Sequence, residues 1–206
     1  MNTALTHNVQ TWLNSEWTAS VKPHLKSLRA LGDDLLIFGG TIRDIALAGG
    51  PTNVSDVDLV LIGTKEQQLE RWAVKVGATK NKFGGFRLET ERCPLDVWRL
   101  EDTWAFRENR VKLAGPRSLL DTPFFTANMA YYSLSEQRVT SSESFRHAIA
   151  HRTLSLLVSE TERPLKQVER ANRFQRRLGL SFTKELSDFV EAQTRKPLRL
   201  GRRPND

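Results

Sequence analysis

Two aspartates that stand two residues apart, Asp56 and Asp58, are the side chains best suited to do chemistry in this sequence. They lie at the head of an apolar run, residues 55–61, whose composition favours a β-strand. In an extended chain, residues i and i+2 point to the same face, so both carboxylates would reach one spot. Mg²⁺ prefers carboxylate oxygens and accepts one or two of them together with substrate phosphates. The pair therefore predicts a magnesium site, although a solvated turn is the commoner setting when this pattern stands alone.

A pair of glycines, Gly39 and Gly40, closes the preceding apolar run and opens a helical pattern that contains Arg43 and Asp44. Backbone amides at a helix N-terminus bind phosphate oxygens, and Arg43 can add a forked, charge-assisted contact. A tight turn with a surface Arg-Asp pair is the alternative interpretation. Because this phosphate cradle and the carboxylate pair lie on consecutive predicted strands, the combination favours nucleoside triphosphate chemistry.

Asp96 is a candidate for a third carboxylate beside Asp56 and Asp58. Phosphoryl transfer with two metal ions works best with three carboxylates. Asp96 lies on a predicted strand among apolar neighbours, where an unpaired carboxylate would be costly. A shared metal would stabilise it, and a salt bridge to Arg99 or Arg87 is the alternative. We expect two Mg²⁺ ions and an NTP at this site.

The elements that must position these side chains alternate in type. Strands are predicted at residues 35–38, 57–62, 83–89, 95–100 and 137–140. Helices are predicted over the first thirty residues, where Pro23 bends or splits the helix, and over residues 41–48 and 66–76. From Thr103 onward the pattern is mainly helical, with a long helix that has Pro164 in its first turn. The predicted fold class is α+β: a mixed sheet of about five strands flanked by helices, followed by a small helical neck.

Positive charge is concentrated in the C-terminal third of the chain. The formal net charge is +7, and residues 138–206 account for all of it. Such asymmetry favours a polyanionic partner, although an Arg-rich solvated surface is the alternative. The best candidates for contacts to an RNA backbone are Arg170, Arg173, Arg176 and Arg177.

Composition excludes several other classes of protein. With 39% hydrophobic and 27% charged residues, the sequence is typical of a soluble globular domain. No apolar stretch approaches the length that a membrane span requires, so we expect a cytoplasmic protein without a membrane partner. One cysteine and four histidines offer too few ligands for a zinc site of thiolates and imidazoles. The expected organisation is a helical extension (1–32), a catalytic head (33–140), a basic helical neck (141–194) and a basic flexible tail (195–206).

Several of these motifs together resemble the head domain of class II CCA-adding enzymes and bacterial poly(A) polymerases, in the DNA polymerase beta nucleotidyltransferase superfamily. The resemblance covers roughly residues 33–182. It rests on G-G-T-I-R-D at 39–44, S-D-V-D-L at 55–59, D-V-W-R at 96–99, F-T-A-N at 125–128 and the neck helix at 164–180.

This resemblance implies Mg²⁺-dependent transfer of a nucleotide from an NTP such as ATP to a 3′ hydroxyl of RNA, with release of pyrophosphate, and a role in tRNA processing. By matching position, Asp56 and Asp58 would bind metal with Asp96 as the third acid, and Asn128 would line the nucleotide pocket. The triphosphate and sugar contacts would come from Gly39, Gly40, Arg43 and Asp44.

The sequence departs from the family pattern at two places and in extent. Thr122-Pro123-Phe124 replaces a charged stretch before the F-T-x-N motif, and the base-reading neck motif survives only as E-R-P-L-K at 162–166. The helical body and tail domains of full-length members are also missing here, so we expect RNA to be held differently. Two alternatives stay open: a compact nucleotidyltransferase that modifies a protein, a small molecule or, as a toxin, tRNA, and a non-catalytic RNA-binding relic.

Overall fold

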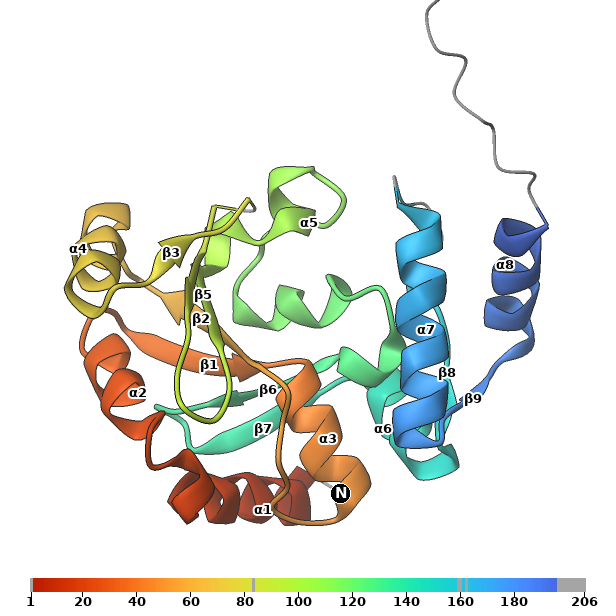
Figure 1. Cartoon of the computed structure of the whole chain (residues 1–206), viewed down its shortest axis with the longest axis horizontal. Helices are drawn as coiled ribbons and strands as arrows, with labels where there is room; N and C mark the ends of the chain where they lie inside the picture. The colour runs from red at the N-terminus through yellow and green to blue at the C-terminus, as the bar shows by residue number, and fades with distance from the viewer. Residues whose placement is uncertain (1, 83, 159–160, 162, 196–206) are drawn as a thin grey trace, which may run out of the picture.

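A mixed seven-stranded sheet forms the centre of the computed structural model, which describes residues 2–82, 84–158, 161 and 163–195 (Figure 1). The strand order is β3-β4-β5-β2-β1-β6-β7. The β2–β5 pair is parallel, and every other neighbouring pair in this sheet is antiparallel. The strands are β1 (Asp34–Phe38), β2 (Val57–Ile62), β3 (Thr79–Lys80), β4 (Phe86–Leu88), β5 (Leu95–Arg99), β6 (Ala130–Ser133) and β7 (Arg138–Ser141).

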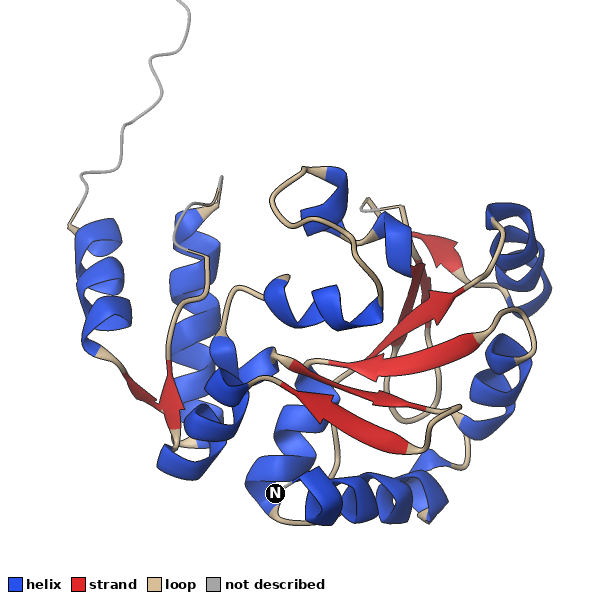
Figure 2. Cartoon of the chain, turned by 180° about the vertical axis from the view of Figure 1, so that it is seen from behind, coloured by secondary structure: helices blue, strands red, loops and turns tan. Residues whose placement is uncertain are grey.

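Helices cover both faces of the sheet, which is why its central strands are apolar on both sides (Figure 2). One face carries Leu35, Ile37 and Leu59 and packs in a single core with residues of the helices α1 to α4. The opposite face carries Leu36, Phe38 and Val60 and packs against the short helical segments after β5. The covering helices are α1 (Asn2–Asn14), η1 (Glu16–Thr18), α2 (Lys22–Arg29), α3 (Gly40–Ala48), α4 (Glu66–Val76), η2 (Leu100–Asp102), α5 (Trp104–Arg107) and η3 (Pro116–Asp121).

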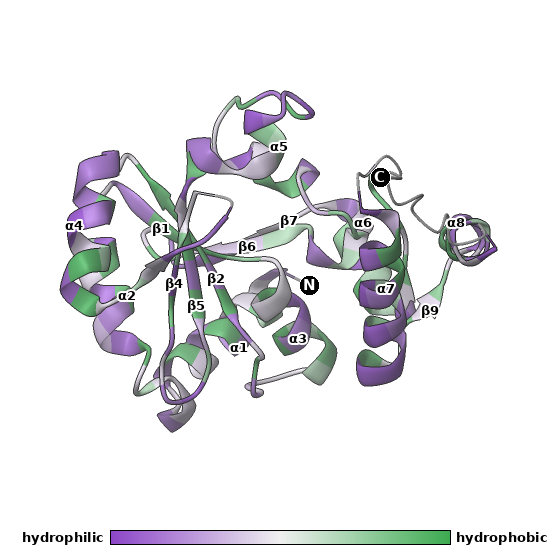
Figure 3. Cartoon of the chain, turned by 45° about the horizontal axis from the view of Figure 1, so that its top comes forward, coloured by the Kyte–Doolittle hydropathy of each residue, from purple (hydrophilic) through white to green (hydrophobic). Residues whose placement is uncertain are grey.

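The C-terminal part forms a smaller helical layer beside the end of the sheet (Figure 1). A third core, which includes Phe125, Phe174 and Leu186, holds its elements together. Figure 3 colours most of α7 as hydrophilic, in keeping with its many arginines. The elements are η4 (Thr126–Asn128), α6 (Glu143–His151), β8 (Thr153–Leu154), α7 (Pro164–Leu178), β9 (Ser181–Phe182) and α8 (Lys184–Thr194); β8 and β9 form a separate parallel pair.

The α+β prediction is confirmed, with differences in the number and length of elements. Residues 57–62 and 66–76 form the predicted strand and helix, and the neck helix begins at Pro164 as expected. The sheet has seven strands instead of about five, because the sequence analysis missed β3 and β6. The N-terminal helix is split in two, and Pro23 lies in the first turn of α2, where its missing amide hydrogen costs nothing.

The two ends of the chain were expected to form a helical extension and a flexible tail. The segment at 1–32 is joined to the sheet, because Leu5, Trp12 and Leu28 are buried in the same core as β1 and β2. The expected flexible tail lies, after residue 195, outside the described residues. In the part of the chain that the structure describes, no helix has the length and apolarity to cross a membrane.

Candidate active site

Three aspartates meet at one end of the central strands. Asp58 and Asp96 are directly paired partners in the parallel β2–β5 ladder, so their side chains share a face of the sheet. Asp56 precedes β2 by one residue, and two hydroxyls hold it in place. The Ser55 hydroxyl donates to Asp56 Oδ1 at 3.0 Å, and the Thr41 hydroxyl donates to the Asp56 carbonyl oxygen at 3.2 Å. Tertiary pairing thus brings the three predicted acids to neighbouring positions.

The electrostatics of Asp58 show how costly this arrangement is without a cation. Burial, followed by the negative charges of Asp56 and Asp96, raises the pKa of Asp58 from 3.8 to about 7. The positive charges of Arg170 and Arg43 oppose this shift. A carboxyl whose pKa is raised this far, among other carboxylates, marks a candidate functional site.

Asp96 has an ion-pair partner of its own. Its Oδ2 accepts a hydrogen bond from Arg87 Nη1 at 2.6 Å, while Arg87 Nε binds Glu89 at 2.9 Å. Burial nevertheless raises the pKa of Asp96, and Arg87 works against that rise. The salt bridge that the sequence analysis offered as an alternative is therefore present, with Arg87 as the partner, because Arg99 is engaged by Asp102.

The Arg87 contact bears on metal binding. Among the residues that the structure describes, no three Asp, Glu, His or Cys side chains are arranged to hold a metal ion. Asp56 and Asp58 both line the cavity described below. Asp96 is the neighbour of Asp58 on β5, and one of its oxygens accepts a hydrogen bond from the Arg87 guanidinium. The metal-binding roles of Asp56, Asp58 and Asp96 stay predictions.

The glycine turn stands directly over the carboxylates. Gly39 is the N-cap of α3, with φ 65° and ψ −109°, a backbone conformation that is essentially restricted to glycine. A Cβ at Gly39 would lie 3.9 Å from Asp58 Oδ2 and 3.8 Å from the Asn128 carbonyl oxygen. The amide groups of the first turn of α3 are therefore presented beside the acids, in the arrangement that favours bound anions.

Gly39→Ala is expected to destabilise the protein by about 1–3 kcal/mol, because the backbone conformation at Gly39 is strained for any residue with a Cβ. Chemical denaturation measures the change. Gly50→Ala is the matched control, since a Cβ there meets nothing within 4 Å and φ is not positive. Equal stabilities of the two variants would contradict the assigned strain.

Arg43 connects three parts of the site. Its Nη1 donates to Asn128 Oδ1 at 2.7 Å, and its Nε and Nη2 lie 2.8 and 2.7 Å from Asp44 Oδ1. Its guanidinium carbon lies 4.3 Å from the centre of the Phe174 ring on α7. The side chain is 7% exposed, so these are buried, charge-assisted contacts. Arg43 and Asp44, predicted to contact the triphosphate, thus also hold α3, η4 and α7 together.

The neck helix closes the site from the opposite side. A cavity of about 200 Å³ lies between α3, the segment before β2, η4 and α7. Among the residues that line it are the predicted Gly40, Arg43, Asp44, Asp56, Asp58, Asn128, Arg170, Arg173 and Arg177. Arg176 does not line this cavity, because its position on α7 turns it to another face.

Three cavity residues had been given no role in the sequence analysis: Ser55, Phe174 and Leu178. Phe174 provides the ring beneath Arg43, and Ser55 holds Asp56. Phe174 lies three residues before Arg177 and one turn after Arg170. This spacing would have placed it at the edge of the helix face that carries those arginines. Arg170, Arg173 and Arg177, predicted to contact RNA, line the same cavity as Asp56 and Asp58.

Comparison with known structures identifies proteins of the same fold. A tRNA-processing enzyme in an apo form matches with a TM-score of 0.60 and 21% identity, over 87% of this chain and 47% of the other. A tRNA nucleotidyltransferase complexed with a primer tRNA and an incoming ATP analog matches with a TM-score of 0.57 and 21% identity, over 78% of this chain and 46% of the other. The Thermotoga maritima CCA-adding enzyme complexed with tRNA matches with a TM-score of 0.58 and 16% identity, over 85% of this chain and 43% of the other.

This chain spans about half the length of those structures. No protein-family model and no curated protein sequence matches it. At these low identities the likeness establishes the fold, and the chemistry has to be argued from the site.

Proposed function

We propose that this protein is a Mg²⁺-dependent nucleotidyltransferase that transfers NMP from an NTP to the 3′ hydroxyl of an RNA, with tRNA as the acceptor. The observation that carries the proposal is the place of Asp56 and Asp58 in one cavity beside the glycine-capped N-terminus of α3, with Asp96 paired to Asp58 in the β2–β5 ladder. The shared fold with tRNA nucleotidyltransferases supports it. In the reaction the 3′ oxygen bonds to the α-phosphorus, the bond from that phosphorus to the bridging oxygen breaks, and pyrophosphate leaves.

The donor set of the site fits magnesium. Asp56, one residue before β2, and Asp58, on β2, bring two carboxylates to one cavity, and the NTP phosphates would complete an oxygen environment. Bound Mg²⁺ would lower the charge on the attacking and leaving oxygens. The raised pKa of Asp58 fits this role, because its ionised form lacks a sufficient counter-charge within the protein alone. We assign Asp96 to accept the proton of the attacking hydroxyl after its salt bridge to Arg87 opens.

The remaining residues of the cavity fit an NTP. The amides of the first turn of α3 face the anion site, and Arg170, Arg173 and Arg177 bring three positive charges from α7. Asn128, which is held by Arg43, lines the same cavity. These groups would orient the triphosphate between the carboxylates and the neck helix.

Incubation with total tRNA and each of the four α-labelled NTPs, with Mg²⁺ or with EDTA, tests the proposal. We expect Mg²⁺-dependent label on RNA, seen on a denaturing gel. Label on protein in place of RNA would support the alternative acceptor, and absence of label in every lane would favour a non-catalytic RNA-binding protein.

The affinity for Mg²⁺ is expected to depend on pH. Because burial and neighbouring charges raise the pKa of Asp58 to about 7, a metal must displace a proton from Asp58 below that pH. Affinity should therefore increase about tenfold per pH unit below pH 7 and become constant above it. Titration calorimetry with Mg²⁺ and a non-hydrolysable NTP analogue, repeated across this range, measures the dependence. A constant affinity from acidic to alkaline pH would remove Asp58 from the set of ligands.

A further inference from the structure

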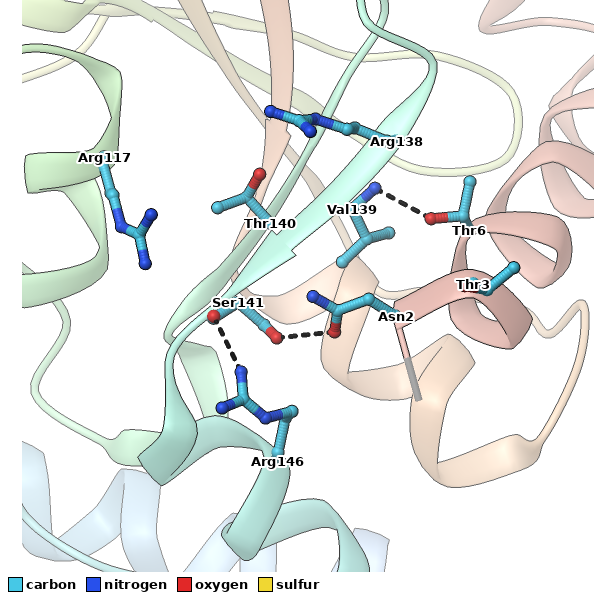
Figure 4. A pocket seen from close by; sticks show the side chains of 9 residues that line it. All are labelled: Asn2, Thr3, Thr6, Arg117, Arg138, Val139, Thr140, Ser141 and Arg146. Carbon is cyan, nitrogen blue, oxygen red and sulfur yellow. Dashed lines mark hydrogen bonds between the residues drawn. The ribbon is translucent and has the colours of Figure 1, made fainter.

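A second cavity lies away from the carboxylates, around the edge strand β7. Its volume is about 490 Å³, and its lining comes from α1, η3, β7 and α6 (Figure 4). Three arginines from three different elements line it: Arg117 from η3, Arg138 from β7 and Arg146 from α6. The described lining includes no Asp or Glu. The cavity is therefore strongly positive.

Each of the three arginines has guanidinium N–H groups that are not used in contacts within the described part of the chain. Arg117 makes no hydrogen bond or ion pair within the described part of the chain. Arg146 uses Nη1 to donate to the Ser141 carbonyl oxygen at 3.2 Å, and Arg138 uses Nε to bind Glu136 at 2.7 Å. Figure 4 shows Arg117 extending from its own helix toward β7, on the side where the Arg138 and Thr140 side chains lie. Each guanidinium has further N–H groups for an anion.

The backbone edge of β7 is protected, so this is not a place for an added strand. The Val139 amide donates to Thr6 Oγ1 at 3.0 Å, and the Ser141 hydroxyl donates to Asn2 Oδ1 at 2.9 Å. The Val139 amide and the Ser141 carbonyl oxygen, which accepts from Arg146 Nη1, are backbone groups that a pairing strand would need.

The lining also distinguishes between kinds of anion. It contains no aromatic side chain, and its single apolar one, Val139, is buried. Pockets for whole small ligands are mostly apolar, with few polar groups. A site with three arginines and several hydroxyls, without a surface on which a base can stack, fits phosphate groups joined in a chain.

The strand register places Arg138 and Thr140 of the cavity lining on the face of the sheet that carries Asp58, whereas Val139 and Ser141 point to the other face, toward α1. Asp58 pairs with Phe38, Phe38 with Tyr131, and Tyr131 with Thr140. Directly paired residues share a face, so Thr140 lies on the same face as Asp58. Three interstrand steps separate them, which is about 15 Å. A nucleic acid chain with its 3′ end at Asp58 would span this distance in a few nucleotides.

We propose that the cavity formed around Arg117, Arg138 and Arg146 binds the phosphodiester backbone of the acceptor RNA upstream of its 3′ end. That the bound RNA is an acceptor rests on the proposed function, whereas the phosphate site itself rests on the cavity and its arginines. The site would bind RNA with residues of the head and of α6, the first helix after it.

The double variant Arg117→Gln/Arg146→Gln tests this proposal through direct RNA binding, measured without NTP or Mg²⁺. Fluorescence anisotropy with a labelled tRNA transcript and with single-stranded homopolymers of two sequences gives the affinities over a range of salt. Each lost phosphate contact should weaken binding about fivefold at 0.1 M salt and lower the slope of log K against log salt by about 0.7. Both effects should be the same for every base sequence.

Arg71→Gln/Lys75→Gln on α4 is the matched control, because it removes the same charge from exposed positions on another part of the surface (Figure 1). The Arg117→Gln single variant removes no protein contact, so it keeps the test valid if Arg146→Gln disturbs folding. The proposal is overturned if the double variant binds RNA as tightly as the control, or if its loss depends on base sequence.

The outcome is independent of catalysis. Wild-type protein that labels RNA, together with a double variant of unchanged RNA affinity, would overturn this site and leave the proposed function standing. RNA binding that needs both arginines, in a protein that labels no RNA, would support the site and contradict the proposed function.

Discussion

Asp58→Asn is expected to reduce nucleotide transfer at least about 10³-fold and, at the same time, to stabilise the metal-free protein above pH 7. The loss of activity follows because the asparagine amide is a poor substitute for a charged metal ligand, and metal stabilisation of the transition state amounts to several kcal/mol. The gain in stability follows because the raised pKa of Asp58 means that its ionised form is disfavoured in the folded state.

The direction of the pH effect follows from linkage. The folded protein holds the Asp58 proton up to about pH 7, whereas the unfolded chain releases it near pH 3.8. The contribution of Asp58 to stability is therefore lost as the pH rises through that window. At about 1.4 kcal/mol per pKa unit, the free energy of unfolding of the Asp58→Asn variant should exceed that of the wild type by on the order of 1–4 kcal/mol at pH 8 and by much less at pH 4.

Denaturant unfolding at both pH values, with EDTA present, measures this gain. Asp188→Asn on α8 is the control, because Asp188 is exposed and its replacement should change the free energy of unfolding by less than about 0.5 kcal/mol. An Asp58→Asn variant that is active, or that is less stable than the wild type at pH 8, would contradict the assigned role.

Arg43→Ala is expected to destabilise the protein by about 3–5 kcal/mol, since it leaves the buried Asp44 carboxylate without its counter-charge. The Asn128 amide oxygen would also lose its partner, and α7 would lose the contact of Phe174 with the guanidinium. Because these residues line the cavity proposed to bind the NTP, NTP affinity should fall as well. Thermal and chemical unfolding, with NTP binding by calorimetry, measure the two effects.

Arg43→Lys tests whether the forked geometry matters beyond the charge. Lysine keeps the charge but lacks the planar fork, so it should recover only part of the lost stability. Lys80→Gln is the control for an exposed ion pair, since both partners are about half exposed and the pair contributes at most about 1 kcal/mol. Equal stability of the Arg43→Ala and Lys80→Gln variants would show that the Arg43 contacts are not needed for folding.

Two positively charged surfaces would then act on one RNA. Arg170, Arg173 and Arg177 of α7 line the cavity with Asp56 and Asp58, whereas the cavity around Arg117, Arg138 and Arg146 lies at the edge strand β7, three strands away from β2. The first would act on the NTP and the 3′ end, and the second on the upstream backbone. The sequence analysis expected the basic C-terminal third to contact RNA; Arg138 and Arg146 belong to that third, whereas Arg117 lies before it.

The missed strand β6 shows one limit of sequence patterns. Its residues, Ala130 to Ser133, are all buried and follow the short helical segment η4, so the chain there shows neither alternation nor a long apolar run. What makes it a strand is its pairing with β1, with Phe38 opposite Tyr131. This is a contact between segments about ninety residues apart, and local propensity does not report it.

The amino-acid sequence by itself determined the local chemistry of this protein. The spacing of Asp56 and Asp58 predicted two carboxylates directed to one spot, and paired glycines marked a helix N-terminus, because both features depend only on neighbours along the chain. Tertiary structure decided the rest: the register that sets Asp96 beside Asp58, the salt bridge from Arg87, and the burial that raises the pKa of Asp58. It also decided the arginine cavity on β7, whose members come from three elements. Distances between such residues, and the loss of water around them, arise only when the segments pack together.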